Sequence, residues 1–421
     1  MKKYVKYPLI TIGVLLGIVF ALLLGLKIYW VLNSADEPVP DDSDLMPEIK
    51  KVPDGDNAYF DLIKIQINMP EGGWEIFNKY KERTLWDQIY VENLISKNKE
   101  NFENFYRAAS KTKFQYPPLA DQKNYTSSLN LVSINSFKQF SEIVSIEAIY
   151  LAKQGKEKEA LDEINKLLSI AQKIQDSGNT LITNLISVAV KKVGINSVRE
   201  ITLSNKSSLS SDDLIQNIKK LDIYKENEHG FLSAWKSEYL MQKNSINIIM
   251  KEIKNPVGSV KNFKKVLSVE DLIGKFNSSF AFKPNETQKL FANNARIHIE
   301  NTKKFCNEII LGDKIDRNYA ATDLKKLIFT ENYFGKKLAS MYVISLFSVV
   351  DKKCSEDANI IETQLLLALK AYEQDNSGKK ASKLSDLVPK YLSEVPVDPF
   401  SGQPVKYSPE GGVKINKERI N

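Results

Sequence analysis

Residues 137–174 read FKQFSEIVSIEAIYLAKQGKEKEALDEINKLLSIAQKI, and their pattern decides the fold class. Apolar residues recur every three or four positions on either side of Gly155, and a third set with the same spacing follows Gly178. This spacing predicts three successive amphipathic helices separated by the two glycines. The apolar positions are Phe137, Phe140, Val144, Ala148 and Leu151, then Ala160, Ile164, Leu167, Leu168 and Ala171, then Leu181, Leu185, Ala189 and Val193. Strand patterns are scarce before Ser393, so we expect a mainly α protein whose body is an α-helical array.

The composition is globular and excludes several classes of protein. Of 421 residues, 43% are hydrophobic and 26% are charged, with a net charge of +7, so the chain is neither disordered nor fibrous. Two cysteines exclude a disulfide-dense scaffold, and two histidines leave little room for histidine-based catalysis or a three-histidine metal site. No phosphate-binding glycine loop, nucleophile elbow or zinc-protease motif occurs. We therefore expect no cofactor and no metal, and a binding protein rather than an enzyme.

A membrane helix is predicted at the N-terminus. Tyr7 to Leu26 are twenty consecutive uncharged, mostly apolar residues, and a helix of that length spans the roughly 30 Å of hydrocarbon in a bilayer. Three lysines precede this run, whereas five acidic residues lie between positions 36 and 44, and no Lys or Arg follows Lys27 until Lys50. The positive-inside rule then keeps the N-terminus in the cytoplasm and sends the bulk of the chain outside the inner (cytoplasmic) membrane. A cleaved signal peptide is the alternative, although its apolar region is shorter and ends at a small-x-small site.

These patterns divide the chain into five parts. Residues 1–6 form a cytoplasmic tail and residues 7–32 a transmembrane anchor. Residues 33–57 are rich in Pro and Asp, which predicts a semi-extended acidic linker that holds the body off the membrane. Residues 58–355 form the external α-helical domain, and residues 356–421 form a small C-terminal α+β module with a helix, a turn and a hairpin.

The stretch from Ala148 to Ile174 resembles one tetratricopeptide hairpin. Ala148, Gly155 and Ala160 fall where that family keeps small residues so that two helices can approach closely. The family's aromatic and terminal proline positions are not matched, and no period of about 34 residues runs through the chain. A generic αα-hairpin is the alternative interpretation. The resemblance implies a protein-binding surface.

The C-terminal region carries a second resemblance. A predicted helix ends near Asp375, the sequence LVPKYL occupies positions 387–392, and PVDP follows at positions 396–399. This order is similar to the C-terminal signature of the major pseudopilins of type II secretion systems. The segment also resembles the end of large, uncharacterised membrane-anchored helical proteins of bacteria that close with an Asp-Pro-Phe turn. Both resemblances imply a helix, a Pro-rich turn and small strands.

The chain departs from the pseudopilin pattern in three respects, the first being that the family's calcium-loop carboxylates are not recognisable. No prepilin cleavage site precedes the apolar run, and about 330 residues separate that run from the signature, so we carry over only the local fold. The residues of the expected turn module are Pro396, Asp398, Pro399, Gly402 and Tyr407. We expect Asp398 to accept backbone N–H bonds inside the turn, not to act in catalysis.

The two cysteines, Cys306 and Cys354, would face an oxidising exterior. There they could form a disulfide, but the sequence does not give the distance between them, and two free buried thiols are equally compatible with it.

We predict a membrane-anchored extracytoplasmic helical protein that binds or scaffolds other proteins of the bacterial envelope. Its partners would be the lipid bilayer, through the N-terminal helix, and envelope proteins. Two alternatives stay open: an accessory component of a type II secretion or pilus-like system, and an envelope enzyme with a carboxylate-based site. Lysine pairs such as Lys191-Lys192 and Lys379-Lys380 are scattered as on solvated helix faces, so we expect no nucleic-acid groove.

Overall fold

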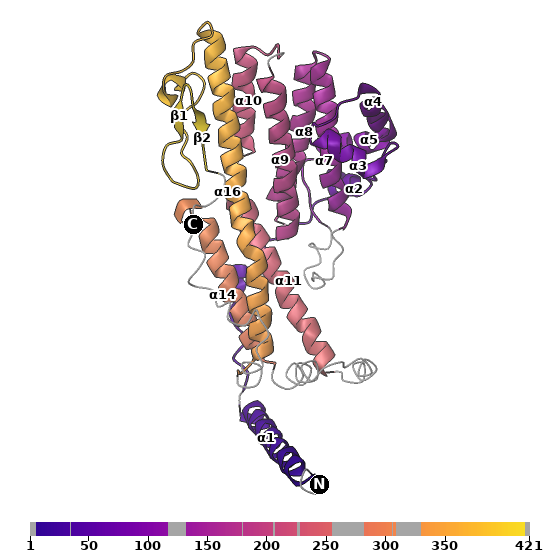
Figure 1. The fold of residues 1–421 in the computed structure, drawn as a ribbon, viewed down its shortest axis with the longest axis vertical. Helices are drawn as coiled ribbons and strands as arrows, with labels where there is room; N and C mark the ends of the chain where they lie inside the picture. The colour runs from indigo at the N-terminus through magenta and orange to yellow at the C-terminus, as the bar shows by residue number, and fades with distance from the viewer. Residues whose placement is uncertain are drawn as a thin grey trace. The chain divides into compact units, whose positions relative to one another are not determined.

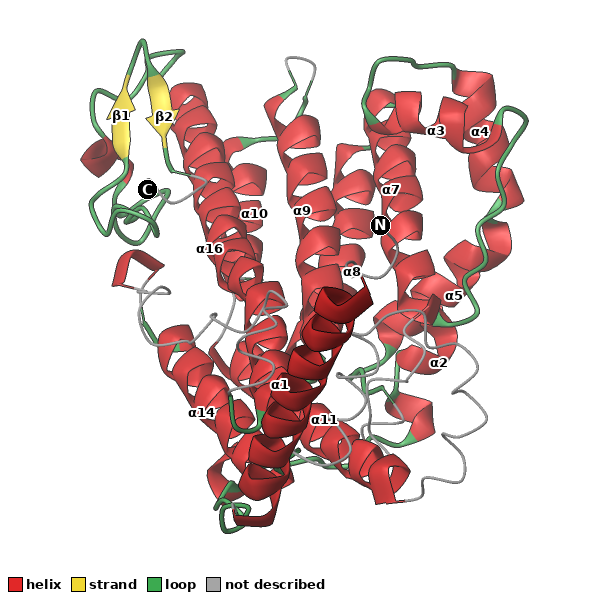
Figure 2. Ribbon diagram, turned by 60° about the horizontal axis from the view of Figure 1, so that its bottom comes forward, coloured by secondary structure: helices red, strands yellow, loops and turns green. Residues whose placement is uncertain are grey.

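The computed structural model describes residues 6–33, 35–116, 132–178, 180–204, 207–224, 228–254, 282–304, 306–308 and 330–416. Within these residues the chain is mainly helical, which confirms the predicted fold class (Figure 1). The α-helices are α1 (Lys6–Asn33), α2 (Tyr59–Leu62), α3 (Gly73–Lys81), α4 (Gln88–Lys97), α5 (Lys99–Ser110), α7 (Val132–Lys153), α8 (Glu157–Asp176), α9 (Leu181–Leu203), α10 (Ser211–Ile223), α11 (Glu228–Lys254), α14 (Pro284–Thr302) and α16 (Tyr333–Asp375). Two short strands, β1 (Lys406–Ser408) and β2 (Gly412–Lys414), form an antiparallel hairpin near the C-terminus (Figure 2).

The contacts divide the chain into two compact units. The first consists of Met1–Leu45, Gln242–Ile297 and Leu311–Leu346, and the second of Met46–Met241, His298–Ile310 and Phe347–Asn421. The expected boundary between residues 355 and 356 falls inside α16, a single helix of 43 residues. This boundary does not separate two compact units, because the buried residues of α16 after position 355 belong to the same hydrophobic cluster as residues of α7 to α10 and of the C-terminal module.

The three helices expected from residues 137–193 are α7, α8 and α9, and they pack against one another in the second unit. Figure 1 shows them side by side with α10. Gly178 follows the end of α8 with a φ of +64°, in the left-handed region that favours glycine. A Cβ at this position would lie 2.5 Å from the Cβ of Ser233, so only glycine fits the turn into α9.

Helix α9 is the central helix of the second unit, and its buried face is not the predicted one. Leu185 and Ala189 are only half-buried, whereas Asn184, Ser187 and Lys191 are at most 2% exposed. Among the described residues α9 is long and apolar enough to cross a membrane, but 61% of its apolar window is buried inside the body. The apolar residues of α9 are therefore explained by their packing against neighbouring helices.

Helix α1 is a continuous helix of 28 residues. The apolar side chains of its described run, Ile12–Gly25, are largely exposed, with Leu16 at 65% and Phe20 at 61%. Unlike α9, this run is not covered by the described part of the protein.

The expected acidic linker contains no α-helix over residues 35–57, and several of these residues bond to or pack against the body. In the first unit, acidic side chains of residues 36–44 bond to α11 and α14. In the second unit, Met46 and Ile49 pack against Tyr116 and Leu240. We expected a spacer, and the structure shows a docked segment, because its carboxylates meet basic residues and amides that lie about 200 or more positions later in the chain.

Candidate functional site

The C-terminal turn module is built around Asp398, a buried carboxylate. Its Oδ1 accepts hydrogen bonds from the backbone N–H groups of Phe400 (2.8 Å) and Ser401 (3.3 Å). Its Oδ2 accepts one from the backbone N–H of Asn416 at 3.0 Å. With three backbone donors on one carboxylate, Asp398 fastens the turn to the residues that follow the hairpin, which is the role expected for a turn carboxylate.

The prolines and the glycine of the module shape the same turn. The carbonyl of Pro396 accepts from the backbone N–H of Val405 at 3.0 Å, and the half-buried Pro399 follows Asp398 directly. Gly402 has a φ of +66°, and a Cβ there would lie 2.4 Å from Nδ2 of Asn307. The turn therefore packs against the short 3-10 helix η4 (Cys306–Glu308), and glycine permits both the backbone conformation and the approach.

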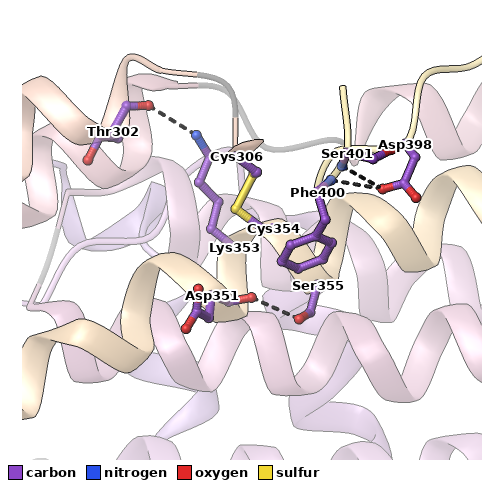
Figure 3. The surroundings of a disulfide bond; sticks show 9 residues. All are labelled: Thr302, Cys306, Asp351, Lys353, Cys354, Ser355, Asp398, Phe400 and Ser401. Carbon is purple, nitrogen blue, oxygen red and sulfur yellow. Dashed lines mark hydrogen bonds between the residues drawn. A yellow bond between two sulfur atoms is a disulfide. The ribbon is translucent and has the colours of Figure 1, made fainter. Parts of the chain in front are cut away.

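Cys306 of η4 and Cys354 of α16 form a disulfide, with Cα atoms 5.9 Å apart. Both residues are buried. Figure 3 shows the Phe400 ring beside Cys354, with the Asp398 turn next to it. Of the two alternatives that the sequence left open, the structure contains the disulfide. It joins η4 to α16 under the C-terminal turn.

Tyr407, the last predicted residue of the module, lies in β1 and lines a pocket. Its hydroxyl donates to the carbonyl of Ala381 at 2.9 Å. The pocket has a volume of about 560 Å³ and is open to solvent. Its walls are the end of α9, a stripe of α16 and the β1–β2 hairpin: Leu203, Ser204, Ser207, Leu366, Leu369, Lys370, Glu373, Gln374, Lys380, Ala381, Tyr407, Pro409 and Gly412.

Two lysines and one glutamate set the charge of this pocket. The ammonium of Lys370 donates to the carbonyls of Thr202 (2.5 Å) and Ser204 (3.1 Å), and burial lowers its pKa. The exposed Lys380 makes one contact of 3.4 Å with the carbonyl of Pro409. In the described part of the chain, neither ammonium has a carboxylate within ion-pair distance. Since Glu373 is the only carboxylate among the described residues that line the pocket, the lining suits a ligand that brings an anionic group next to apolar surface.

The structure offers no metal centre among its described residues, where no group of three or more His, Cys, Asp or Glu side chains gathers. His298 is buried and stacks on Trp235, with ring centroids 4.3 Å apart. Burial lowers the pKa of His298 to about 4, so its imidazole is neutral at physiological pH. The side chain of the other histidine, His229, lies outside the described residues.

Sequence reasoning missed a buried ion pair in the second unit. We assigned Lys191, with its neighbour Lys192, to a solvated helix face, and this was wrong for Lys191. Its side chain is 0% exposed and lies 2.6 Å from the carboxylate of Glu356, which is 1% exposed. Lys191 also donates to Gln175 and to the carbonyl of Tyr224. The lysine points inward because α9 is covered on nearly all sides, which spacing within α9 alone does not indicate.

Compared with known proteins, the chain matches no family model, no curated protein and no solved structure. The function must therefore be argued from the residues and geometry of the chain itself.

Proposed function

We propose that this chain is a single-pass protein of the bacterial inner membrane, with its N-terminus inside and its helical body outside. The observation that carries this proposal is the exposed apolar surface of α1. A helix of 28 residues is about 42 Å long, enough to cross a bilayer. Leaving the apolar side chains of Ile12–Gly25 in water is unfavourable, whereas burying them in lipid is favourable.

The flanking charges and the disulfide support the orientation. Lysines precede α1 and acidic residues follow it, the arrangement that keeps the N-terminus cytoplasmic. Disulfides persist in oxidising compartments and are rare in the cytosol, so the Cys306–Cys354 bond favours a body outside the membrane.

Reporter fusions test this topology. Alkaline phosphatase fused after residue 421 is expected to be active, and a green fluorescent protein fused at the same place is expected to be dark. The same two fusions to a chain that lacks residues 7–26 should reverse. If the phosphatase fused to the full chain is inactive and the green fluorescent protein fused to it is fluorescent, the body lies in the cytoplasm and the proposal is overturned.

We further propose that the body binds envelope proteins through the pocket beside the β1–β2 hairpin. Its volume lies in the range of ordinary ligand pockets, roughly 300–1,000 Å³. Its leucines and Tyr407 offer apolar surface, and Lys370 and Lys380 offer ammonium groups. This combination suits a peptide segment that carries a carboxylate among apolar side chains. With one carboxylate among the lining residues that the structure describes, the pocket does not favour an enzyme with paired carboxylates.

A short peptide probe tests the binding role. The full chain in nanodiscs is titrated with fluorescent acetyl-Leu-Leu-Glu-Leu-amide and with its glutamine counterpart. We expect the glutamate probe to bind at least tenfold more tightly, and Lys380→Glu to remove that preference. Lys379→Glu is the matched control, because Lys379 is equally exposed and does not line the pocket. Equal binding of the two probes, or equal loss in both variants, would exclude this pocket as the binding site.

An accessory role in a type II secretion or pilus-like system is a second proposal. It is favoured by the order of the C-terminal elements: α16 ends at Asp375, the Pro-rich turn follows, and the β1–β2 hairpin closes the region. A deletion strain is expected to secrete or to assemble pili poorly. Normal secretion and piliation in that strain would contradict this role.

A further inference from the structure

The segment that follows α1 carries five acidic residues and no basic one between positions 35 and 45. On composition alone, such a segment repels itself and acts as an extended tether. In the structure four of its five acidic side chains, those of Asp36, Glu37, Asp42 and Asp44, instead bond to the body within the first unit. The segment ends at Leu45, which is fully buried.

The first contact caps a helix. The carboxylate of Asp36 accepts from the backbone N–H groups of Asn285 (2.8 Å) and Glu286 (3.1 Å), at the start of α14. The side-chain amide of Asn285 in turn donates to the carbonyl of Glu37 at 2.8 Å. A carboxylate at this place satisfies amides that have no partner inside the helix and meets the positive end of the helix dipole.

Further contacts continue along the same helix. Glu37 pairs with Lys289 at 2.5 Å, and Asp44 makes two contacts with the guanidinium of Arg296, at 2.7 and 2.9 Å. Asp42 accepts from Lys243 of α11 at 2.6 Å and from the side-chain amide of Gln288 at 2.9 Å. The segment thus follows α14 from its first turn to Arg296, in the same direction as the helix.

Chain length then limits how far the body can stand from the membrane. Helix α1 ends at Asn33, and Asp36 is already bound to α14. Three extended residues reach about 10 Å, and the Asp36 side chain adds a few more. A free tether through Leu45 would instead reach roughly 40 Å.

We propose that residues 35–45 are a fixed strap, which holds the first turn of α14 within roughly 15 Å of the membrane end of α1. The surface around that turn is then the part of the body that faces the lipid headgroups. The statement about headgroups rests on the proposed membrane anchor, whereas the strap's contacts with α14 do not depend on it.

Proteolysis of the full chain in nanodiscs tests the strap. The protease Asp-N cuts before aspartate, so it can cleave at Asp36, Asp41, Asp42 and Asp44 only where the strap is accessible. The release variant changes the basic partners and leaves the strap's own sequence intact: Lys243→Gln, Lys289→Gln and Arg296→Gln. Cleavage of the strap is monitored by mass spectrometry. We expect it to be at least tenfold faster in the release variant than in the wild type.

A matched control removes the same charge elsewhere, with Lys192→Gln, Lys219→Gln and Lys379→Gln. These lysines are exposed, and they are not among the described partners of residues 35–45. The control is expected to resist cleavage like the wild type. Rapid strap cleavage in the wild type, or equal rates in all three proteins, would overturn the proposal.

Energy transfer tests the distance to the bilayer. A donor dye on Asn293→Cys, an exposed position on α14, is combined with acceptor dyes on the lipid headgroups. We expect strong transfer in the wild type and in the control, and weaker transfer in the release variant. Weak transfer in a nanodisc-bound wild type would refute the membrane-facing surface. A chain that stays protected from Asp-N but fails to join nanodiscs would refute the anchor and leave the strap's contacts standing.

Discussion

Replacing Lys191 by methionine tests whether the second unit depends on its buried ion pair. The ammonium of Lys191 lies 2.6 Å from Glu356, and both side chains are at most 1% exposed. Removing one partner of such a pair leaves an uncompensated charge in the interior, at a cost of about 3–5 kcal/mol. Because 1 kcal/mol shifts the Tm of a unit of this size by roughly 2–4 °C, Lys191→Met should lower it by about 6–20 °C.

Thermal unfolding of the detergent-solubilised full chain, followed by circular dichroism with the disulfide intact, measures this effect. Lys220→Met is the control, because Lys220 pairs with Asp162 at 3.6 Å and their side chains are 44% and 66% exposed. Its cost should stay below about 1 kcal/mol. The double variant Lys191→Met, Glu356→Leu should recover most of the lost stability, because it removes both charges. A Lys191→Met protein as stable as the Lys220→Met protein would refute the reasoning.

Three further predictions concern the second unit. Burial raises the pKa of Glu238 from 4.5 to about 7, so between these pH values the folded state keeps a proton that the unfolded chain releases, and stability falls as the pH rises. Glu238→Gln should therefore raise the Tm at pH 8 and not at pH 4. An equal effect at both pH values would contradict this. The Cys306–Cys354 bond closes a loop over 48 positions, so replacing both cysteines by serine should lower the free energy of unfolding, measured by denaturant titration, by about 4 kcal/mol. An unchanged midpoint of the unfolding transition would show that the bond is dispensable for stability. Asp398→Ala removes the acceptor of three backbone N–H groups and should lower the free energy of unfolding by about 1–3 kcal/mol. The amide of Phe400 should then exchange its hydrogen faster than in the wild type. Unchanged exchange there would show that the turn does not depend on this carboxylate.

The mainly α class and three successive helices of the body could be predicted, because the apolar spacing of an amphipathic helix is visible over a few turns of sequence. The spacing around Gly155 and Gly178 located α7, α8 and α9, and the C-terminal prolines located a turn before the hairpin. Local periodicity was less informative for α9, where Asn184 and Lys191 are buried although the apolar pattern predicts a different inward face. Neighbours cover most of α9 and leave only a narrow exposed stripe with Lys192 and Asn196, so the polarity of its residues no longer indicates its orientation.

The sequence by itself determined the helical class, three successive helices and the place of an uncharged run long enough to cross a bilayer, since these depend on residues close together in the chain. Only the tertiary structure decided the partners of the charged groups, Glu356 for Lys191 and α14 for Asp36, and whether Cys306 and Cys354 bond to each other. Each of these pairs joins residues 48 to about 250 positions apart. Whether a charged side chain is solvated, paired or caps a helix depends on what the fold brings next to it. Composition alone therefore predicted an extended acidic linker, whereas in the folded chain this segment is docked on the body.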